Sequence, residues 1–182
     1  MGKFEKYKID LKGMTDNSFS CSFQLDDRFF ADVDATEISK GKLTVDLDVK
    51  KKIGVYELSF RTEGYVIVSC DRCLDDMEQP ISTSDKLLVK LGADYSEEND
   101  IVIIPEEEGA INVAWFIYEF IVLNIPIKHT HPFGKCNRDM MSELSKHSAG
   151  EYDEDSEESD SKSAGNEMDP RWNELKKIID NN

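Results

Sequence analysis

The sequence predicts an α+β fold: a mainly antiparallel β-sheet domain with one buried helix, an acidic disordered tether and a C-terminal helix. Much of the first hundred residues alternates apolar and polar side chains, a period of two that is typical of strands with one buried face. One long apolar stretch follows, and the chain then loses its apolar periodicity. We therefore expect a single α+β domain (1–147), a disordered acidic linker (148–168) and a terminal helix (169–182).

The strands are expected to begin close to the N-terminus. Turn-rich residues 13–17 separate the first two strands, and Lys51 to Gly54 form the turn of the clearest hairpin. Between the second strand and this hairpin, Asp26 to Ala31 can form one or two helical turns, with Phe29 and Phe30 as the apolar contacts. In chain order, the predicted strands are residues 6–11, 18–25, 43–49, 55–60, 65–69, 81–91 and 101–104.

Two helices are predicted between residue 112 and the acidic linker. Asn112 can cap a helix over residues 113–123, and Pro126 ends it. Its residues are apolar on nearly every side, which predicts a helix buried all round in the core. Glu119 interrupts that apolar surface, and we interpret it as a charge at the helix edge; the alternative is a functional carboxylate. Arg138 to Lys146 form a second, shorter helix with an apolar face.

The charge of the chain restricts its partners. The 182 residues include 22 Lys and Arg against 38 Asp and Glu, a net charge of −16. Residues 148–169 alone hold nine acidic residues and one lysine, a net of −8. Such a surface repels nucleic acid, whose affinity for proteins comes from Lys and Arg, and it attracts basic proteins. The alternative is that the charge only keeps the protein soluble.

The end of the chain predicts an amphipathic helix. Asp169 is a suitable N-cap and Pro170 fits the first helical position. An apolar stripe on a helix that follows a tether must dock on its own domain or on a partner. We therefore predict a partner-binding face made by Trp172, Leu175, Ile178 and Ile179.

The expected compartment is the cytoplasm. The N-terminus has no apolar core of the kind a signal peptide needs. The longest apolar stretch, residues 113–125, is broken by Glu119 and Asn124 and is shorter than the roughly 20 residues of a membrane span. Four cysteines without an export signal indicate thiols or metal ligands and not disulfides.

The sharpest chemical motif is the pair Cys70 and Cys73. A C-x-x-C turn holds two thiolates close enough to bind one tetrahedral metal ion, and zinc accepts Cys and His together. His131 and Cys136 supply two further candidate ligands after the apolar helix, and His129 could substitute for His131. The sequence thus predicts a structural zinc site, provided that the fold brings both loops to one end.

Two other interpretations of these cysteines remain open. A thioredoxin-like redox pair requires C-x-x-C at the start of a helix after a strand, and residues 74–80 are too short for such a helix. Otherwise the thiols are reduced and partly buried, with no ligand. Cys21 falls within a strand and is expected to be a small core residue. No other motif indicates catalysis, so we expect a protein that is not an enzyme.

Four ordered motifs resemble those of one family. Val68 to Cys73 match V-x-C-x-R-C, and Glu119 to Pro126 match E-x-I-x-L-x-x-P. His131 with Cys136, and then the closing Asp169-Pro170-Arg171-Trp172, complete the likeness. The chain is therefore similar to the YceD family, the large ribosomal RNA subunit accumulation proteins. It keeps only His131 and Cys136 where the four-cysteine members have a second C-x-x-C.

The resemblance implies a bacterial or organellar factor that is needed for normal accumulation of large-subunit ribosomal RNA, and it does not imply an enzyme. With the charge, it predicts a basic ribosomal protein or an assembly intermediate as the partner. A second hypothesis is direct RNA binding by a basic patch at Lys50, Lys51, Lys52 and Arg61. A third, a metal-dependent nuclease of ribosomal RNA precursors, needs an open metal position, and a Cys3His site leaves none.

Overall fold

A computed structural model describes residues 2–34, 37–98 and 100–147, and all structural statements below concern these residues. Most of them belong to a compact unit, Met1–Lys146. The predicted acidic linker and the predicted C-terminal helix lie outside the described residues. So does the predicted partner-binding face of Trp172, Leu175, Ile178 and Ile179.

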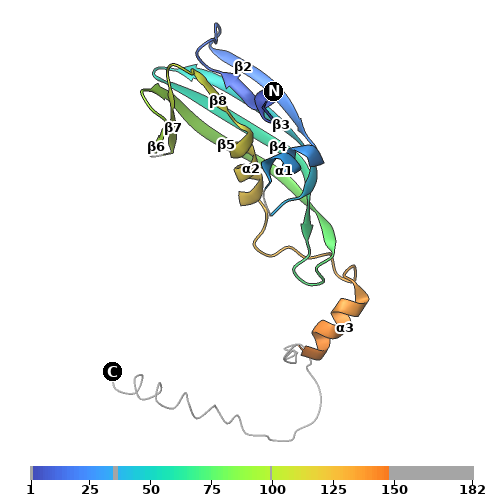
Figure 1. Cartoon of the computed structure of the whole chain (residues 1–182). Coiled ribbons are helices and arrows are strands. Elements are labelled where there is room, and N and C mark those ends of the chain that lie inside the picture. Colours follow the sequence, from blue (N-terminus) through green and yellow to red (C-terminus); the bar gives the residue numbers. More distant parts are fainter. Residues whose placement is uncertain (1, 35–36, 99, 148–182) are drawn as a thin grey trace, which may run out of the picture. The chain divides into compact units, whose positions relative to one another are not determined.

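A six-stranded sheet forms the centre of this unit, and its long strands follow one another along the chain (Figure 1). Neighbouring strands are antiparallel except for β5 and β7, which run parallel. Across the sheet, the strands are β2 (Ser18–Leu25), β3 (Lys40–Lys52), β4 (Val55–Ser69), β5 (Asp76–Gly92), β7 (Ile101–Pro105) and β6 (Ser96–Glu98).

A second, two-stranded sheet joins the start of the chain to the segment before the long apolar helix. It pairs β1 (Lys8–Asp10), which follows a 3₁₀ turn (Glu5–Tyr7), with β8 (Ala110–Asn112). The Val113 amide donates to the Tyr7 carbonyl at 3.0 Å, which continues this contact to the helix. The N-terminus is thus fixed to a segment about a hundred residues later.

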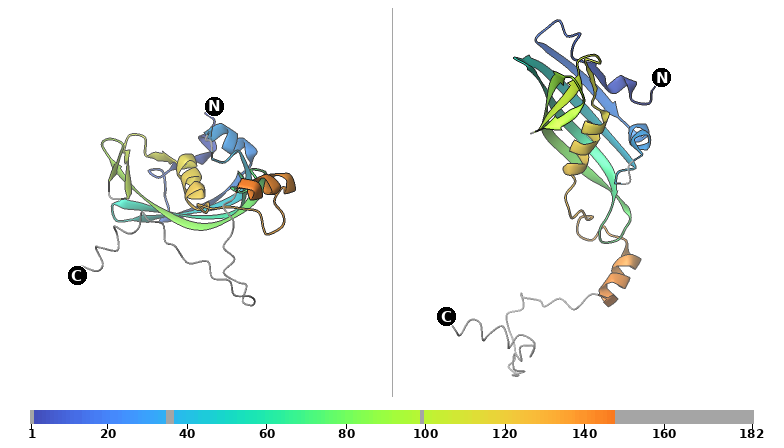
Figure 2. Two further views of the ribbon diagram at one scale, coloured as in Figure 1. Left: turned by 90° about the horizontal axis from the view of Figure 1, so that it is seen from below. Right: turned by 60° about the vertical axis from the view of Figure 1, so that its left-hand side comes forward.

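Three helices complete the described fold. Asp26 caps α1 (Asp27–Val33) by accepting hydrogen bonds from two amides of its first turn. The apolar stretch forms α2 (Ala114–Leu123), and α3 (Arg138–His147) follows a long loop. Figure 2 shows α1 and α2 on one concave face of the sheet, so we call the opposite face the open face.

The main core lies between the sheet and these two helices. Alternate residues of β3 and β4, such as Leu47 and Leu58, are fully buried, while those between them point to the open face. Aromatic rings of the first thirty residues pack at one end of this core, with Tyr7 and Phe29 at a centroid distance of 5.2 Å. The predicted α+β fold with a mainly antiparallel sheet is therefore confirmed.

The apolar helix differs from its prediction in burial. We expected it to be buried all round, but only Ala114, Ile117, Tyr118 and Ile121 are buried, and one face is solvent-exposed. The sheet contacts a single side of α2, so apolar composition alone overstates its burial. The helix also begins one residue later than predicted, although the Asn112 side chain accepts a 3.0 Å hydrogen bond from the Ala114 amide.

Several strand boundaries also differ from the predictions. Residues 55–60 and 65–69 belong to one long strand, β4, and not to two, because Gly64 continues the strand with a φ of 147°. The short strands β6 and β8 were not predicted, since three residues are too few to show an alternating pattern. Among the described residues, no helix has the length and apolar character that a membrane crossing requires.

Candidate metal centre

The C-x-x-C motif lies at the tip of the β4–β5 hairpin. This hairpin extends beyond the rest of the sheet, because β3 pairs with β4 only as far as Ile67, whereas β4 and β5 remain paired to Ser69 and Asp76. The Cys70 amide donates to the Asp75 carbonyl at 2.9 Å, which closes the loop. Leu74 adopts a left-handed conformation with a φ of 63°, and the sharp turn brings both sulfurs to one side.

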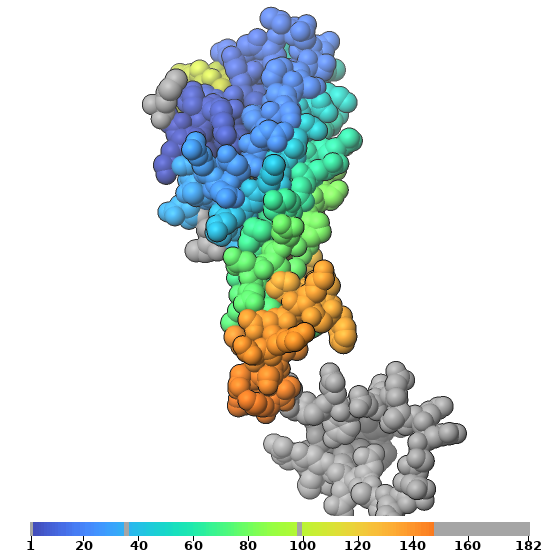
Figure 3. Space-filling view, turned by 90° about the vertical axis from the view of Figure 1, so that its right-hand side faces the viewer, coloured from blue at the N-terminus to red at the C-terminus, as the bar shows by residue number. Residues whose placement is uncertain are grey.

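The loop between α2 and α3 supplies the other two ligands. Its backbone is fixed to the hairpin by a reciprocal contact: the Asp71 amide donates to the His129 carbonyl at 2.9 Å, and the His129 amide donates to Asp71 Oδ2 at 2.7 Å. Figure 3 shows this second loop, in orange, against the green tip of the hairpin. Segments about sixty residues apart are therefore held side by side before any metal is considered.

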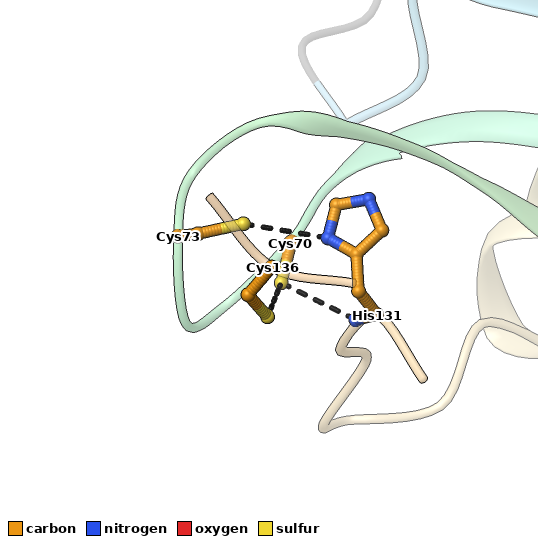
Figure 4. Close-up of side chains that lie close together, drawn as sticks. All are labelled: Cys70, Cys73, His131 and Cys136. Carbon is orange, nitrogen blue, oxygen red and sulfur yellow. Dashed lines mark hydrogen bonds between the residues drawn. The ribbon is translucent and has the colours of Figure 1, made fainter. Parts of the chain in front are cut away.

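Cys70, Cys73, His131 and Cys136 converge on one point, with four ligand atoms that all lie within 4.8 Å of one another (Figure 4). Cys70 Sγ and Cys136 Sγ are 4.0 Å apart, and Cys73 Sγ lies 3.3 Å from His131 Nδ1. Tetrahedral zinc, about 2.3 Å from sulfur and about 2.0 Å from nitrogen, would place two sulfurs about 3.8 Å apart and sulfur and nitrogen about 3.5 Å apart. The donor set and its spacing therefore fit zinc.

Backbone amides prepare the first thiol for ionisation. Burial opposes charge on Cys70, but the amides of His131, Cys73 and Arg72 together outweigh it and lower the pKa of the thiol. Two of these amides lie 3.4 Å from Cys70 Sγ. Burial raises the pKa of Cys136, and so do its neighbours Cys73 and Cys70. A divalent cation would relieve that mutual repulsion.

The surroundings of the four ligands are partly polar and partly apolar. Met77 and Met141 pack against the three buried cysteines, which form a small cluster separate from the main core. Asn137 Nδ2 donates to Asp75 Oδ2 at 3.2 Å, linking the loop after Cys136 to the hairpin. Sequence reasoning did not identify these supporting residues, because their contacts join segments that are far apart in the chain.

The geometry decides between His131 and His129. His129 Nδ1 instead lies 3.0 Å from the Pro126 carbonyl, and His129 Nε2 lies 3.6 Å from Asp71 Oδ1. His131 is therefore the histidine of the cluster. In the described part of the chain, no helix begins at Cys73, because strand β5 starts at Asp76. The helix that a thioredoxin-like redox pair requires after the second cysteine is therefore missing. Cys21 is half-buried in β2, packed against the main core.

The fold and this site define a small α+β protein with a Cys3His cluster joining two loops at one end of its sheet. Residues 58–179 match the family described as Large ribosomal RNA subunit accumulation protein YceD. The chain belongs to the YceD family. The name of the family connects this chain to the accumulation of large-subunit ribosomal RNA. Searches of curated proteins and of solved structures found no match.

Proposed function

We propose that this protein is a non-enzymatic cytoplasmic factor that supports large-subunit ribosomal RNA accumulation by binding a basic ribosomal protein or an assembly intermediate. The family match over residues 58–179 carries this proposal. The site adds support, because four protein ligands fill a tetrahedral zinc and leave no position for water or substrate. A zinc ion at this site would therefore have a structural role.

The charge of the chain supports a basic partner. At −16, the protein has a field that repels free RNA and attracts cationic surfaces. Half of this charge belongs to residues 148–169, which carry a net of −8. Ribosomal proteins must neutralise RNA phosphates and are therefore rich in Lys and Arg. An acidic surface can shield such a protein until RNA displaces it.

The first test is a pull-down with the full chain, in which bound proteins and bound RNAs are both identified. We expect basic large-subunit proteins to be enriched, and their binding to weaken as salt shortens the electrostatic range to about 8 Å. A variant lacking residues 150–166 should bind more weakly and with less salt dependence. Tight binding of naked RNA, with no ribosomal protein retained, would contradict the proposal.

Direct RNA binding is a second candidate, favoured by the arrangement of lysines on the open face. Lys50 and Lys52 of β3 point to the open face, because the residues next to them in the strand face the core side of the sheet. The same alternation places Lys86 and Lys90 of β5 on the open face. Two acidic residues lie among them, Asp48 of β3 and Glu57 of β4. The contact of Glu57 with Lys52 Nζ at 2.6 Å lowers the pKa of Glu57, as do the charges of Lys52, Lys86 and Lys50.

This patch differs from the one predicted from the sequence. Lys51 falls on the opposite side of β3, 5.9 Å from the centre of the Tyr56 ring. Arg61 is opposite Asp46 in the register, away from the strand end that carries the lysines. Lys86 and Lys90 were not predicted, because the pairing of β4 with β5 cannot be deduced from composition.

Filter binding of single-stranded RNA across a salt series tests this second candidate. Replacing Lys86 and Lys90 by Gln should weaken binding and reduce the slope of log K against log salt by about 0.7 for each lost phosphate contact. The same replacement of Lys40 and Lys42, at the other end of the open face, is the matched control. Equal slopes in both variants would exclude the patch as an RNA contact.

A further inference from the structure

The exposed face of α2 carries an unusual combination of side chains. Trp115, Glu119 and Leu123 are spaced by four residues, so they share one side of the helix. This side faces away from the core, and Trp115 is 54% and Leu123 79% exposed. A tryptophan loses much apolar area from water when a partner covers it, and it is characteristic of binding surfaces. The residues that the structure describes leave this area uncovered.

A second exposed aromatic ring is found in the same acidic part of the chain. Tyr95 directly precedes β6 and is 58% exposed. Its pKa is raised to about 12, first by a hydrogen bond to Glu97, then by partial burial, and further by the charges of Glu97 and Glu119. The charge of Glu119, which is 24 residues further along the chain, contributes least to this shift.

Hydrogen bonds orient both carboxylates beside the rings. Tyr95 Oη donates to Glu97 Oε1 at 2.5 Å, and Trp115 Nε1 donates to Glu119 Oε1 at 2.6 Å. The Trp115 ring also packs on Tyr118, with centroids 5.6 Å apart, which limits its rotation. Each glutamate uses one oxygen in these bonds, so the other oxygen can accept a hydrogen bond from a partner.

The charge of the surrounding chain indicates the sign of that partner. Residues 91–127, which include β6, β7, β8 and α2, contain eight Asp and Glu and no Lys or Arg. A cationic partner therefore meets no repulsive charge from this part of the chain. An anionic partner such as RNA would be repelled, and an uncharged apolar partner would have to bury Glu97 and Glu119 without compensation.

We propose that Tyr95, Glu97, Trp115 and Glu119 form the surface that binds a cationic side chain, preferably arginine, of the basic partner. A guanidinium is flat, stacks on aromatic rings and offers five donors to carboxylates, whereas the lysine ammonium is a compact, strongly hydrated charge. The proposal rests on the proposed function for the identity of the partner. Its chemistry rests on two observed pairs, Tyr95 with Glu97 and Trp115 with Glu119, in each of which an aromatic side chain donates to a carboxylate.

The surface is tested first with a peptide, which does not depend on the identity of the partner. An eight-residue peptide of alternating Arg and Gly is titrated into the full chain, and the indole N–H signals are followed by NMR. The Trp115 signal is assigned by its loss in Trp115→Phe. We expect this signal to shift, with weaker binding of the Lys-Gly peptide and no shift with Gln-Gly. An unmoved Trp115 signal would overturn the proposal.

Conservative variants separate a specific contact from general attraction to an acidic protein. Glu97→Gln with Glu119→Gln removes two charges while keeping the shape, and should weaken binding of the arginine peptide about tenfold. Glu63→Gln with Asp46→Asn, on the open face, removes the same charge elsewhere. Equal weakening in both pairs would show that only net charge matters, and would overturn the proposed surface.

Proteins extracted from purified large ribosomal subunits then connect the surface with the proposed function. We expect the wild-type chain to retain identified basic proteins, and the Glu97/Glu119 variant to retain about tenfold less. If wild type and variant retain them equally, the surface is wrong while the proposed function stands. If wild type retains none of them, the proposed function fails, and the peptide titration still decides whether the surface binds cations.

Discussion

The sheet and the cysteine cluster of this protein are stabilised by different interactions. The main core packs aliphatic and aromatic side chains from the long strands and from both α1 and α2. Around the ligands at the hairpin tip, Met77 and Met141 are the only partly buried apolar side chains of the described residues that pack on the cysteines. Hydrophobic burial can therefore stabilise the sheet, whereas at the tip we expect a bound metal to reinforce the few backbone contacts that join the two loops.

This comparison predicts that a cavity in the main core has the largest effect on the free energy of unfolding. Phe60 is buried in β4 and its ring packs on Phe120 at a centroid distance of 5.3 Å. Phe60→Ala should lower the free energy of unfolding by about 3–5 kcal/mol, because it leaves a cavity in a close-packed region. Denaturant unfolding measures the loss. Zinc content of the folded fraction should stay the same, and a parallel loss of zinc would contradict two independent regions.

Removal of a ligand should have the converse effect. We expect about one zinc per chain in reduced protein purified without added metal, and none in Cys73→Ser. Amide hydrogen exchange should then accelerate at residues 70–76 and 128–137, while protection in β3 and in the centre of β4 persists. The melting temperature should also fall. Freshly purified wild-type protein without zinc, by elemental analysis, would refute the metal site.

The two histidines of the loop sharpen the assignment further. His131→Ala should release zinc, because it deletes a ligand 3.3 Å from Cys73 Sγ. His129→Ala should retain zinc, since its ring contacts only the Pro126 carbonyl and Asp71. Competition with a chromogenic chelator compares the zinc affinities of the two variants. Equal affinities would show that either histidine can complete the site.

The smallest expected effect concerns the turn itself. Leu74 has a φ of 63°, a conformation that costs a leucine roughly 1 kcal/mol, and its side chain is exposed. Leu74→Asn should raise the melting temperature by about 2–4 °C, because asparagine tolerates this conformation. Leu74→Ala keeps the strain and serves as the control. An equal rise in both variants would mean that the leucine destabilises the turn for another reason.

The sequence predicted the metal cluster better than the surfaces. A C-x-x-C turn fixes its own geometry, so Cys70 and Cys73 could be identified from spacing, and His131 and Cys136 from ligand chemistry. Surfaces depend on pairing between distant strands, which spacing does not encode. The grouping of Lys86 with Lys50 requires the register of two hairpins, and the exposure of Trp115 depends on which side of α2 packs on the sheet.

The wide separation of the two ligand pairs has a consequence for synthesis on the ribosome. The β4–β5 hairpin is made of contacts between close sequence neighbours, and such structures form quickly. His131 follows Cys73 by 58 residues, which at about 5–20 residues per second takes roughly 3–12 seconds to translate. During this interval the nascent chain carries a two-thiol site with no partner loop. We expect metal capture to be completed only after the loop that carries His131 and Cys136 has left the exit tunnel.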